Sequence, residues 1–246
     1  MSPISYEVGT EETNGGLTSD KAYAAFIRVL SARLSEKGLP MPVFIVGQTG
    51  TLTRMTENVG KYNTDAAVWL SRDARKFGVG LKEHNGDYLS DRLLYLHPVM
   101  GVTATNVAPE YGVAETAAYL ELVQVEDYLV EQGKARPSGF LKVLRDASVH
   151  CGRWRKWMVG ADAQKSEAEV LADDHLTELI TRTGGHYVFE ESQVKAALAE
   201  LFKNLRLAGL EPERIVLDRI KNSIGHYVEC FQLTGITEKI RTYAEG

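Results

Sequence analysis

The chain has 246 residues, of which 44% are hydrophobic and 25% charged, and its formal net charge is −5. This is ordinary soluble-globular composition, and an acidic balance without a basic tract argues against a nucleic-acid partner. No apolar run approaches the ~20 residues that a membrane span needs, and the start, Met1-Ser2-Pro3, lacks the pattern of a signal peptide. We therefore expect a cytoplasmic protein whose cysteines, Cys151 and Cys230, are free thiols rather than a disulfide.

The first half of the sequence repeats one pattern four times, in which an apolar run of strand length leads through a short polar loop into a helical stretch. Strands are expected at residues 4–9, 43–47, 79–82 and 101–104, and helices at 19–37, 65–77, from about 90, and 112–132. Strand and helix in alternation, with short connections, predict parallel strands joined by right-handed crossovers.

Polar side chains follow each predicted strand, among them Glu11, Gln48, His84 and Asn106. Because the carboxyl ends of all barrel strands meet on one face, four polar strand ends indicate one shared site and favour a barrel over a doubly wound sheet. The alternative stays open that polar residues follow strands simply because loops are solvated.

The pattern changes after residue 132, where Pro137-Ser138-Gly139 marks a break and amphipathic helices are predicted at 166–183, 192–208 and 211–224. We expect residues 1–136 to form a half-barrel of four βα units and residues 137–246 to form a helical region that packs on the barrel or makes subunit contacts. A full barrel takes ~250 residues, and four βα units already take about half of this chain, so the expected fold class is α/β, half of a (β/α)8 TIM-type barrel. Its two open edges imply a longer protein or strands from another chain.

The densest group of reactive residue types lies at the end of the third predicted strand. Alternate residues of a strand face the same side, so Lys82 and His84 share one face and Glu83 lies on the other. His84 is a candidate divalent-metal ligand or proton-transfer group, with a locally hydrogen-bonded loop histidine as the alternative. Glu11, after the first strand, is a candidate metal ligand or general base, with a solvated acidic loop as the alternative.

Further candidates depend on weaker signals. Two glycine-containing loops, Gly15-Gly16 and Gly47-Gln48-Thr49-Gly50, offer backbone N–H groups that could hold a phosphate. Lys82 is a candidate for a Schiff base with a ketose, although nothing in the sequence indicates a lowered pKa. We expect His97 to be structural. The tryptophans Trp154 and Trp157, beside basic residues, suit core packing or an interaction surface.

Four segments in the same order resemble the accessory-subunit family of class II tagatose-bisphosphate aldolase, the GatZ/KbaZ type. They are Val8-Gly9-Thr10-Glu11 with Gly15-Gly16, Val46-Gly47-Gln48-Thr49-Gly50, Glu83-His84-Asn85-Gly86-Asp87-Tyr88, and Val107-Ala108-Pro109. The resemblance covers nearly the whole chain through short motifs. The chain differs from the family in its shorter loop at Glu12-Thr13-Asn14 and at Lys82, which stands where an acidic residue is usual.

The resemblance implies a TIM-type barrel with added helices, ketose-phosphate substrates and support of a catalytic aldolase subunit. Some relatives are credited with metal-dependent 4-epimerisation of ketoses. By this resemblance the chain begins at what looks like the fifth strand, which would make it the C-terminal half of the (β/α)8 barrel and, by itself, catalytically incomplete. By position, the residues expected in catalysis are Glu11, Lys82 and Asp87. Those expected to bind substrate are Gly15, Gly16, Gln48, Thr49, Asn85 and Asn106. Those expected to bind a divalent metal, for which zinc is one candidate, are Glu11 and His84.

Two functions follow from these observations. The first is a ketose-phosphate-processing barrel, either an accessory aldolase subunit or a related metal-dependent ketose epimerase. The alternative is a truncated barrel that acts only as a structural or oligomerisation subunit through its open edges or helical tail. The expected partners are a sugar-phosphate substrate and a catalytic aldolase subunit or a chain that supplies the missing barrel half, in an oligomer, with neither nucleic acid nor membrane.

Overall fold

The computed structural model describes residues 4–9 and 16–245. The chain divides into two compact units. Unit 1 comprises Met1–Val107 together with Tyr227–Gly246, and unit 2 comprises Ala108–His226. The sequence analysis placed the boundary at residue 136, after the long fourth helix. That helix instead belongs to unit 2, because its apolar side chains pack within the helical core of that unit.

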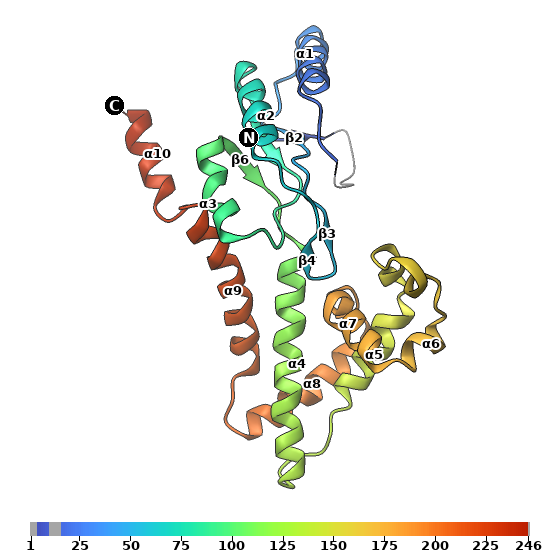
Figure 1. The fold of residues 1–246 in the computed structure, drawn as a ribbon. Coiled ribbons are helices and arrows are strands. Elements are labelled where there is room, and N and C mark those ends of the chain that lie inside the picture. Colours follow the sequence, from blue (N-terminus) through green and yellow to red (C-terminus); the bar gives the residue numbers. More distant parts are fainter. Residues whose placement is uncertain (1–3, 10–15, 246) are drawn as a thin grey trace. The chain divides into compact units, whose positions relative to one another are not determined.

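Unit 1 is built on a parallel sheet of four strands in the order β1-β2-β5-β6 (Figure 1). The strands are β1 Glu7–Val8, β2 Phe44–Gly47, β5 Gly80–Glu83 and β6 Val102–Thr105. Val46 of β2 lies opposite Lys82 of β5, and Lys82 lies opposite Ala104 of β6. The register brings the carboxyl ends of all four strands to one edge of the sheet, as the strand–helix alternation predicts.

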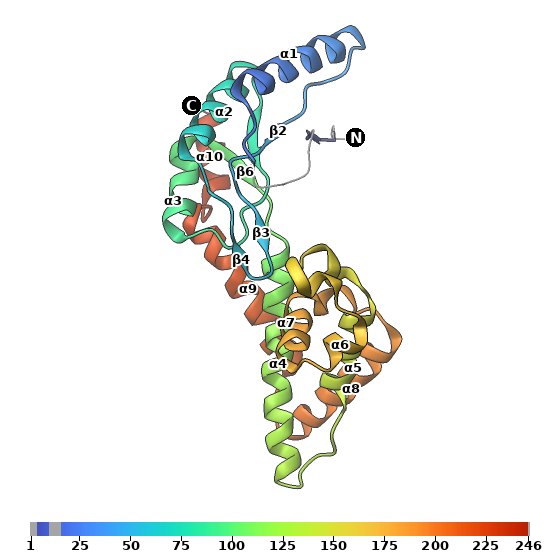
Figure 2. The ribbon, with the colours of Figure 1, turned by 45° about the vertical axis from the view of Figure 1, so that its right-hand side comes forward.

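Three helices connect these strands and pack on one face of the sheet (Figure 2). They are α1 Asp20–Glu36, α2 Thr64–Lys76 and α3 Asp91–Met100. Their apolar residues bury Ile45, Leu81 and Val102 of the strands. Since successive side chains of a strand alternate between its faces, the neighbours Val46 and Lys82 point to the opposite face.

The helix ends follow from local sequence. The side chains of Ser19 and Asn63 accept hydrogen bonds from the backbone N–H groups of Ala22 and Ala66, which caps α1 and α2. Gly101 ends α3 with a φ of 83°, a left-handed conformation that glycine adopts without steric cost.

Unit 1 also contains elements that the sequence analysis did not predict. A hairpin of two short antiparallel strands, β3 Thr53–Arg54 and β4 Glu57–Asn58, lies between β2 and α2. The last part of the chain adds helix α10, Ile236–Glu245. Two-residue strands are too short to give a periodic signal, which explains why the hairpin was missed.

Unit 2 is helical and has its own core. Its α-helices are α4 Pro109–Glu131, α5 Phe140–His150, α6 Glu167–Leu171, α7 Asp174–Gly184, α8 Ser192–Leu207 and α9 Pro212–Cys230, of which the last four residues belong to unit 1. Short 3₁₀ turns lie at Arg153–Lys156, Gly160–Gln164 and Gly185–Tyr187. The core includes Leu122, Phe140, Leu144, Leu201 and Leu205, all nearly or fully buried.

The α/β class and the parallel strands are confirmed, whereas the described strands form an open sheet and not a closed barrel. Cys151 and Cys230 are free, as expected. Trp154 is buried and donates its ring N–H to the carbonyl of Val149, while Trp157 stacks on Tyr187. No described helix is both long and apolar enough to cross a membrane.

Candidate functional site

The carboxyl ends of the four parallel strands surround a cavity of about 390 Å³ on the face of the sheet away from α1, α2 and α3. We call this the strand-end cavity; its lining residues are Glu7, Gly9, Val46, Lys82, His84 and Asn106. Alternation along the strands explains the set, because Glu7 and Gly9 share one face of their strand, as do Lys82 and His84. The cavity therefore gathers a carboxylate, an ammonium, an imidazole and an amide.

Lys82 and Glu7 form an ion pair across the cavity. The Nζ atom of Lys82 lies 2.7 Å from both carboxylate oxygens of Glu7. The Lys82 side chain is 18% exposed and that of Glu7 is 45% exposed, so water screens the pair and its contribution to stability is at most about 1 kcal/mol. A ligand that binds Lys82 would have to compete with Glu7. An ion-paired ammonium is not a nucleophile, so this geometry does not favour a Schiff base at Lys82.

His84 is half-buried at the end of β5. Burial lowers the pKa of its imidazole, and the positive charge of Lys82 lowers it further, against a smaller opposing effect of Glu7. The imidazole is therefore neutral at pH 7 and can accept a proton or ligate a metal.

The loop that follows β5 is fixed by the β3–β4 hairpin and the residues around it. Thr51 donates its hydroxyl to the carbonyl of His84 at 2.8 Å, and Thr53 donates to the side-chain oxygen of Asn85 at 2.9 Å. Asn58 donates its amide to the carbonyl of Asp87 at 3.1 Å. The hairpin thus holds the loop that positions His84.

The opposite face of β5 carries a buried ion pair. Glu83 is fully buried, and one of its oxygens lies 3.0 Å from Nε2 of His97, which is 2% exposed. Thr49 donates its hydroxyl to the other oxygen at 3.0 Å. Burial by itself would lower the pKa of His97, but the hydrogen bond and the charge of Glu83 raise it overall, with help from the carbonyl of Leu93. The pKa of Tyr62 is raised by burial and by the charge of Glu83.

Both ring nitrogens of His97 face acceptors, since Nδ1 lies 2.7 Å from the carbonyl oxygen of Leu93. A backbone carbonyl can only accept, so Nδ1 carries a proton. The Nε2 atom faces the carboxylate of Glu83, whose hydrogen bond and charge raise the pKa of His97 and so favour its imidazolium form. His97 thus has a partner that its sequence position did not suggest.

The predicted site residues fall into three groups. Lys82, His84 and Asn106 line the strand-end cavity. Those that lie elsewhere are Gly16, which is exposed, Asn85, which holds the loop, and the buried residues Gln48, Thr49 and Asp87. Glu11 and Gly15 lie outside the described residues. Glu7 was missed, although strand alternation puts it on the same face as Gly9 and could have identified it.

The residues of the cavity were also compared with the needs of a divalent metal. In the part of the chain that the structure describes, no group of three histidine, cysteine or acidic side chains could hold a metal ion. His84 offers one neutral nitrogen ligand, but the Lys82 ammonium beside it repels a dication. The described residues therefore do not fit a metal site by themselves.

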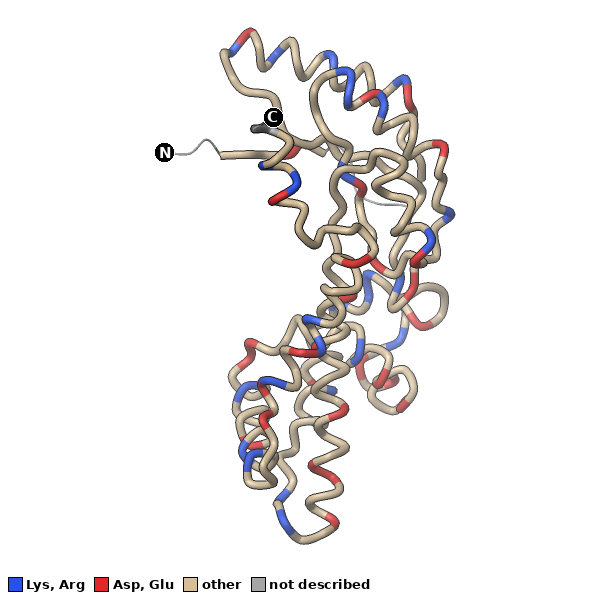
Figure 3. Tube along the Cα trace, turned by 90° about the vertical axis from the view of Figure 1, so that its left-hand side faces the viewer, with Lys and Arg blue, Asp and Glu red and all other residues tan. Residues whose placement is uncertain are grey.

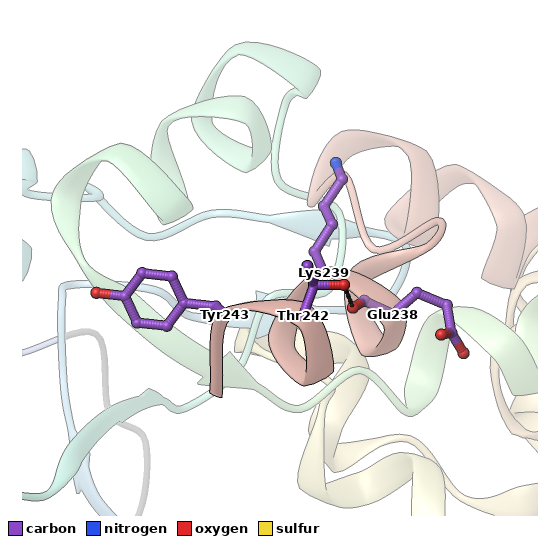
Figure 4. A pocket seen from close by; sticks show the side chains of 4 residues that line it. All are labelled: Glu238, Lys239, Thr242 and Tyr243. Atoms are coloured by element: carbon purple, nitrogen blue, oxygen red, sulfur yellow. Dashed lines mark hydrogen bonds between the residues drawn. The ribbon is translucent and has the colours of Figure 1, made fainter. Parts of the chain in front are cut away.

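A hollow of about 820 Å³ lies along α10 and is not a comparable site. Figure 4 shows that all four of its lining residues, Glu238, Lys239, Thr242 and Tyr243, come from this one helix. Tyr243 is 91% exposed. The hollow is an open surface feature that brings no residues of different elements together.

Comparisons with known proteins inform the fold. No protein-family model matches this chain. No curated protein sequence matches it either. Among solved structures, it is similar to a probable tagatose 6 phosphate kinase from Sinorhizobium meliloti 1021, with 18% identity and a TM-score of 0.69, over 92% of this chain and 62% of that one.

A second similar structure is the fructuronate-tagaturonate epimerase UxaE from Cohnella laeviribosi, with 12% identity and a TM-score of 0.47, over 93% of this chain and 46% of that chain. The chain thus spans less than two thirds of the length of either protein. At these identities the first likeness shows a shared fold, and the second is too weak to carry an argument.

Proposed function

We propose that this chain acts in the metabolism of phosphorylated ketoses and binds its ligand in the strand-end cavity. The observation that supports this most directly is the convergence of Lys82 and His84 from the end of β5 and of Asn106 from the end of β6 onto one cavity. Carboxyl ends of parallel strands are where α/β enzymes bind their ligands. The similar structure from Sinorhizobium meliloti is a probable kinase of a ketose phosphate, which is consistent with this substrate class.

Each lining group suits one part of such a ligand. The Lys82 ammonium can bind a phosphate or a carbonyl oxygen once Glu7 is displaced, and the Asn106 amide can bind sugar hydroxyls. The neutral imidazole of His84 can accept a proton from the ligand. The volume of about 390 Å³ lies within the range of small-molecule sites, ~300–1,000 Å³.

Within this function we favour an accessory aldolase subunit or a related metal-dependent ketose 4-epimerase. A metal at His84 would need further ligands, for which Glu11 and residues of another chain are the candidates. Elemental analysis after dialysis against trace divalent metal separates the two roles. About one bound ion per chain, lost in His84→Ala, would support the epimerase. The absence of a bound ion would support the accessory subunit.

A binding experiment tests the ligand class. The chain is titrated calorimetrically with D-tagatose 6-phosphate and with unphosphorylated D-tagatose. We expect saturable binding of the phosphorylated sugar that weakens at least about tenfold in Lys82→Gln, as the loss of one charge-assisted hydrogen bond implies. Lys142→Gln is the matched control, because it removes a lysine from another carboxylate ion pair, with Asp146 in unit 2. Equal affinity in both variants would reject the cavity as the site.

A second candidate function, assembly with another chain, is supported by the edge of the sheet. Within the described sheet β6 pairs only with β5, so its other edge can accept a strand. An apolar cavity of about 360 Å³ lies beside it, lined in part by Val102, Phe231, Leu233 and Ile236. An extended segment from the chain that carries the other barrel strands is the expected occupant. Light scattering tests this, since a folded, well-behaved monomer would argue against it.

A further inference from the structure

Unit 2 contains a second pocket that combines a rigid frame with an excess of positive charge. The pocket has a volume of about 460 Å³ and lies between the loop that joins α4 to α5 and the helix α8. We call it the loop pocket; its lining includes Lys134, Arg136 and Ser138 of the loop and Glu200, Lys203 and Asn204 of α8. Two elements distant in sequence therefore contribute polar groups to one hollow.

A buried hydrogen-bond network fixes the loop. The Glu126 carboxylate, 3% exposed on α4, accepts hydrogen bonds from the backbone N–H of Ser138 at 3.2 Å and from its hydroxyl at 2.7 Å. Asn204 donates to the same carboxylate and to the carbonyl of Arg136, the latter at 2.8 Å. Three donors thus satisfy the buried charge of Glu126, and the loop backbone is held to two helices.

The charges that face the pocket do not cancel. Lys203 pairs with Glu200 at 2.9 Å, and this pair is neutral. Lys134 and Arg136 make no ion pair with any described residue. Their two charges match a phosphate monoester, which carries about −1.5 to −2 at pH 7. The planar guanidinium of Arg136 can also bind two phosphate oxygens at once.

Lys134 and Arg136 both lie on a short loop that is held by the hydrogen bonds of Glu126 and Asn204. Figure 3 shows basic residues on this loop and on α8. A loop that is already ordered loses little conformational entropy when a ligand binds. These side chains are not needed for the fold of the loop, because the network that holds it uses Glu126, Ser138 and Asn204 and only the backbone of Arg136.

We propose that the loop pocket binds the phosphate group of a small molecule through Arg136 and Lys134, at a site separate from the strand-end cavity. Asn204 and Ser138 act as positioning residues that fix the loop.

The test uses the full chain and inorganic phosphate as the probe, titrated at constant ionic strength with sodium chloride as compensating salt. Backbone amide shifts of residues 133–139 report binding at the pocket. We expect saturable shifts there that weaken at least about tenfold in Arg136→Gln and in Lys134→Gln, because each loses one charge-assisted contact. Arg182→Gln on α7 is the matched control, since Arg182 is exposed, carries the same charge and lies in the same unit.

The outcomes separate this site from the proposed function. Lys82→Gln should leave the shifts at residues 133–139 unchanged, whatever it does to sugar-phosphate binding in unit 1. A titration with glycerol phosphate shows whether the pocket takes phosphate monoesters or only the free ion. If the shifts do not saturate, or if Arg182→Gln weakens them as much as Arg136→Gln does, binding is nonspecific and the proposal is wrong. Circular dichroism confirms that each variant is folded.

Discussion

Replacing His97 with alanine removes one member of the buried pair behind β5. In the native chain Glu83 is fully buried, and its carboxylate lies 3.0 Å from His97 and 3.0 Å from the hydroxyl of Thr49. After the change, a buried carboxylate keeps the Thr49 hydrogen bond but loses its cation. Breaking a buried pair from one side costs about 3–5 kcal/mol, which is a large part of the stability of a typical domain.

The assay is urea unfolding combined with hydrogen exchange detected by mass spectrometry, which reports unit 1 through peptides of residues 80–105. We expect faster exchange of these peptides in His97→Ala and little change in peptides of unit 2. The double change Glu83→Gln with His97→Leu removes both charges and should cost much less than His97→Ala, because no unpaired charge remains. A loss below about 1 kcal/mol in His97→Ala would refute the description of the pair as buried and charged.

The contribution of the His97–Glu83 pair to stability should also depend on pH. The folded pKa of His97 is raised above its ordinary value of 6.5. A histidine with a raised folded pKa contributes its full stabilisation below the unfolded pKa and loses it as pH rises through the folded pKa. The difference in stability between the native chain and His97→Ala should therefore be largest below pH 6.5 and shrink above it. A difference that grows with pH would contradict this sign.

Three further predictions concern other parts of the chain. Lys82→Gln should change the free energy of unfolding in urea by less than about 1 kcal/mol, because its pair with Glu7 is partly exposed; a larger loss would mean that the pair is structural. An NMR titration of the His84 imidazole should give a pKa below 6.5, since burial and Lys82 both disfavour its charged form, and a value above 6.5 would contradict the geometry of the cavity. Leu144→Ala, at a fully buried position in unit 2, should cost about 2–5 kcal/mol in urea unfolding, and a cost near zero would mean that the helical core is not packed as described.

Much of unit 1 could be predicted from sequence periodicity. The apolar runs at β2, β5 and β6 and the helices between them have strong patterns, and the strand–helix order fixes parallel pairing. The opposite orientations of Glu83 and His84 also follow from strand alternation. In the structure Glu83 contacts His97, whereas His84 lines the strand-end cavity. The boundary between the two units could not be predicted from the sequence, because the sequence of α4 does not reveal which core its apolar side chains enter.

The candidate site was harder to predict than the fold. Lys82, His84 and Asn106 were found because they stand at the ends of recognisable strands. Thr49 and Asp87 stand near the same ends, yet their side chains are buried away from the cavity, since a turn after a strand does not keep the two-residue alternation. The partnership of Glu83 with His97 depends on how α3 packs against β5, which no local pattern encodes.

The alternation along β5 has a practical consequence for mutagenesis of the strand-end cavity. Lys82 and His84 face the cavity and can be randomised with little risk to the fold, whereas Glu83, which stands between them, belongs to a buried ion pair. A library that varies three consecutive codons would lose most of its members to unfolding. One that varies the first and third and keeps the middle codon fixed would explore the same cavity with most of its members intact.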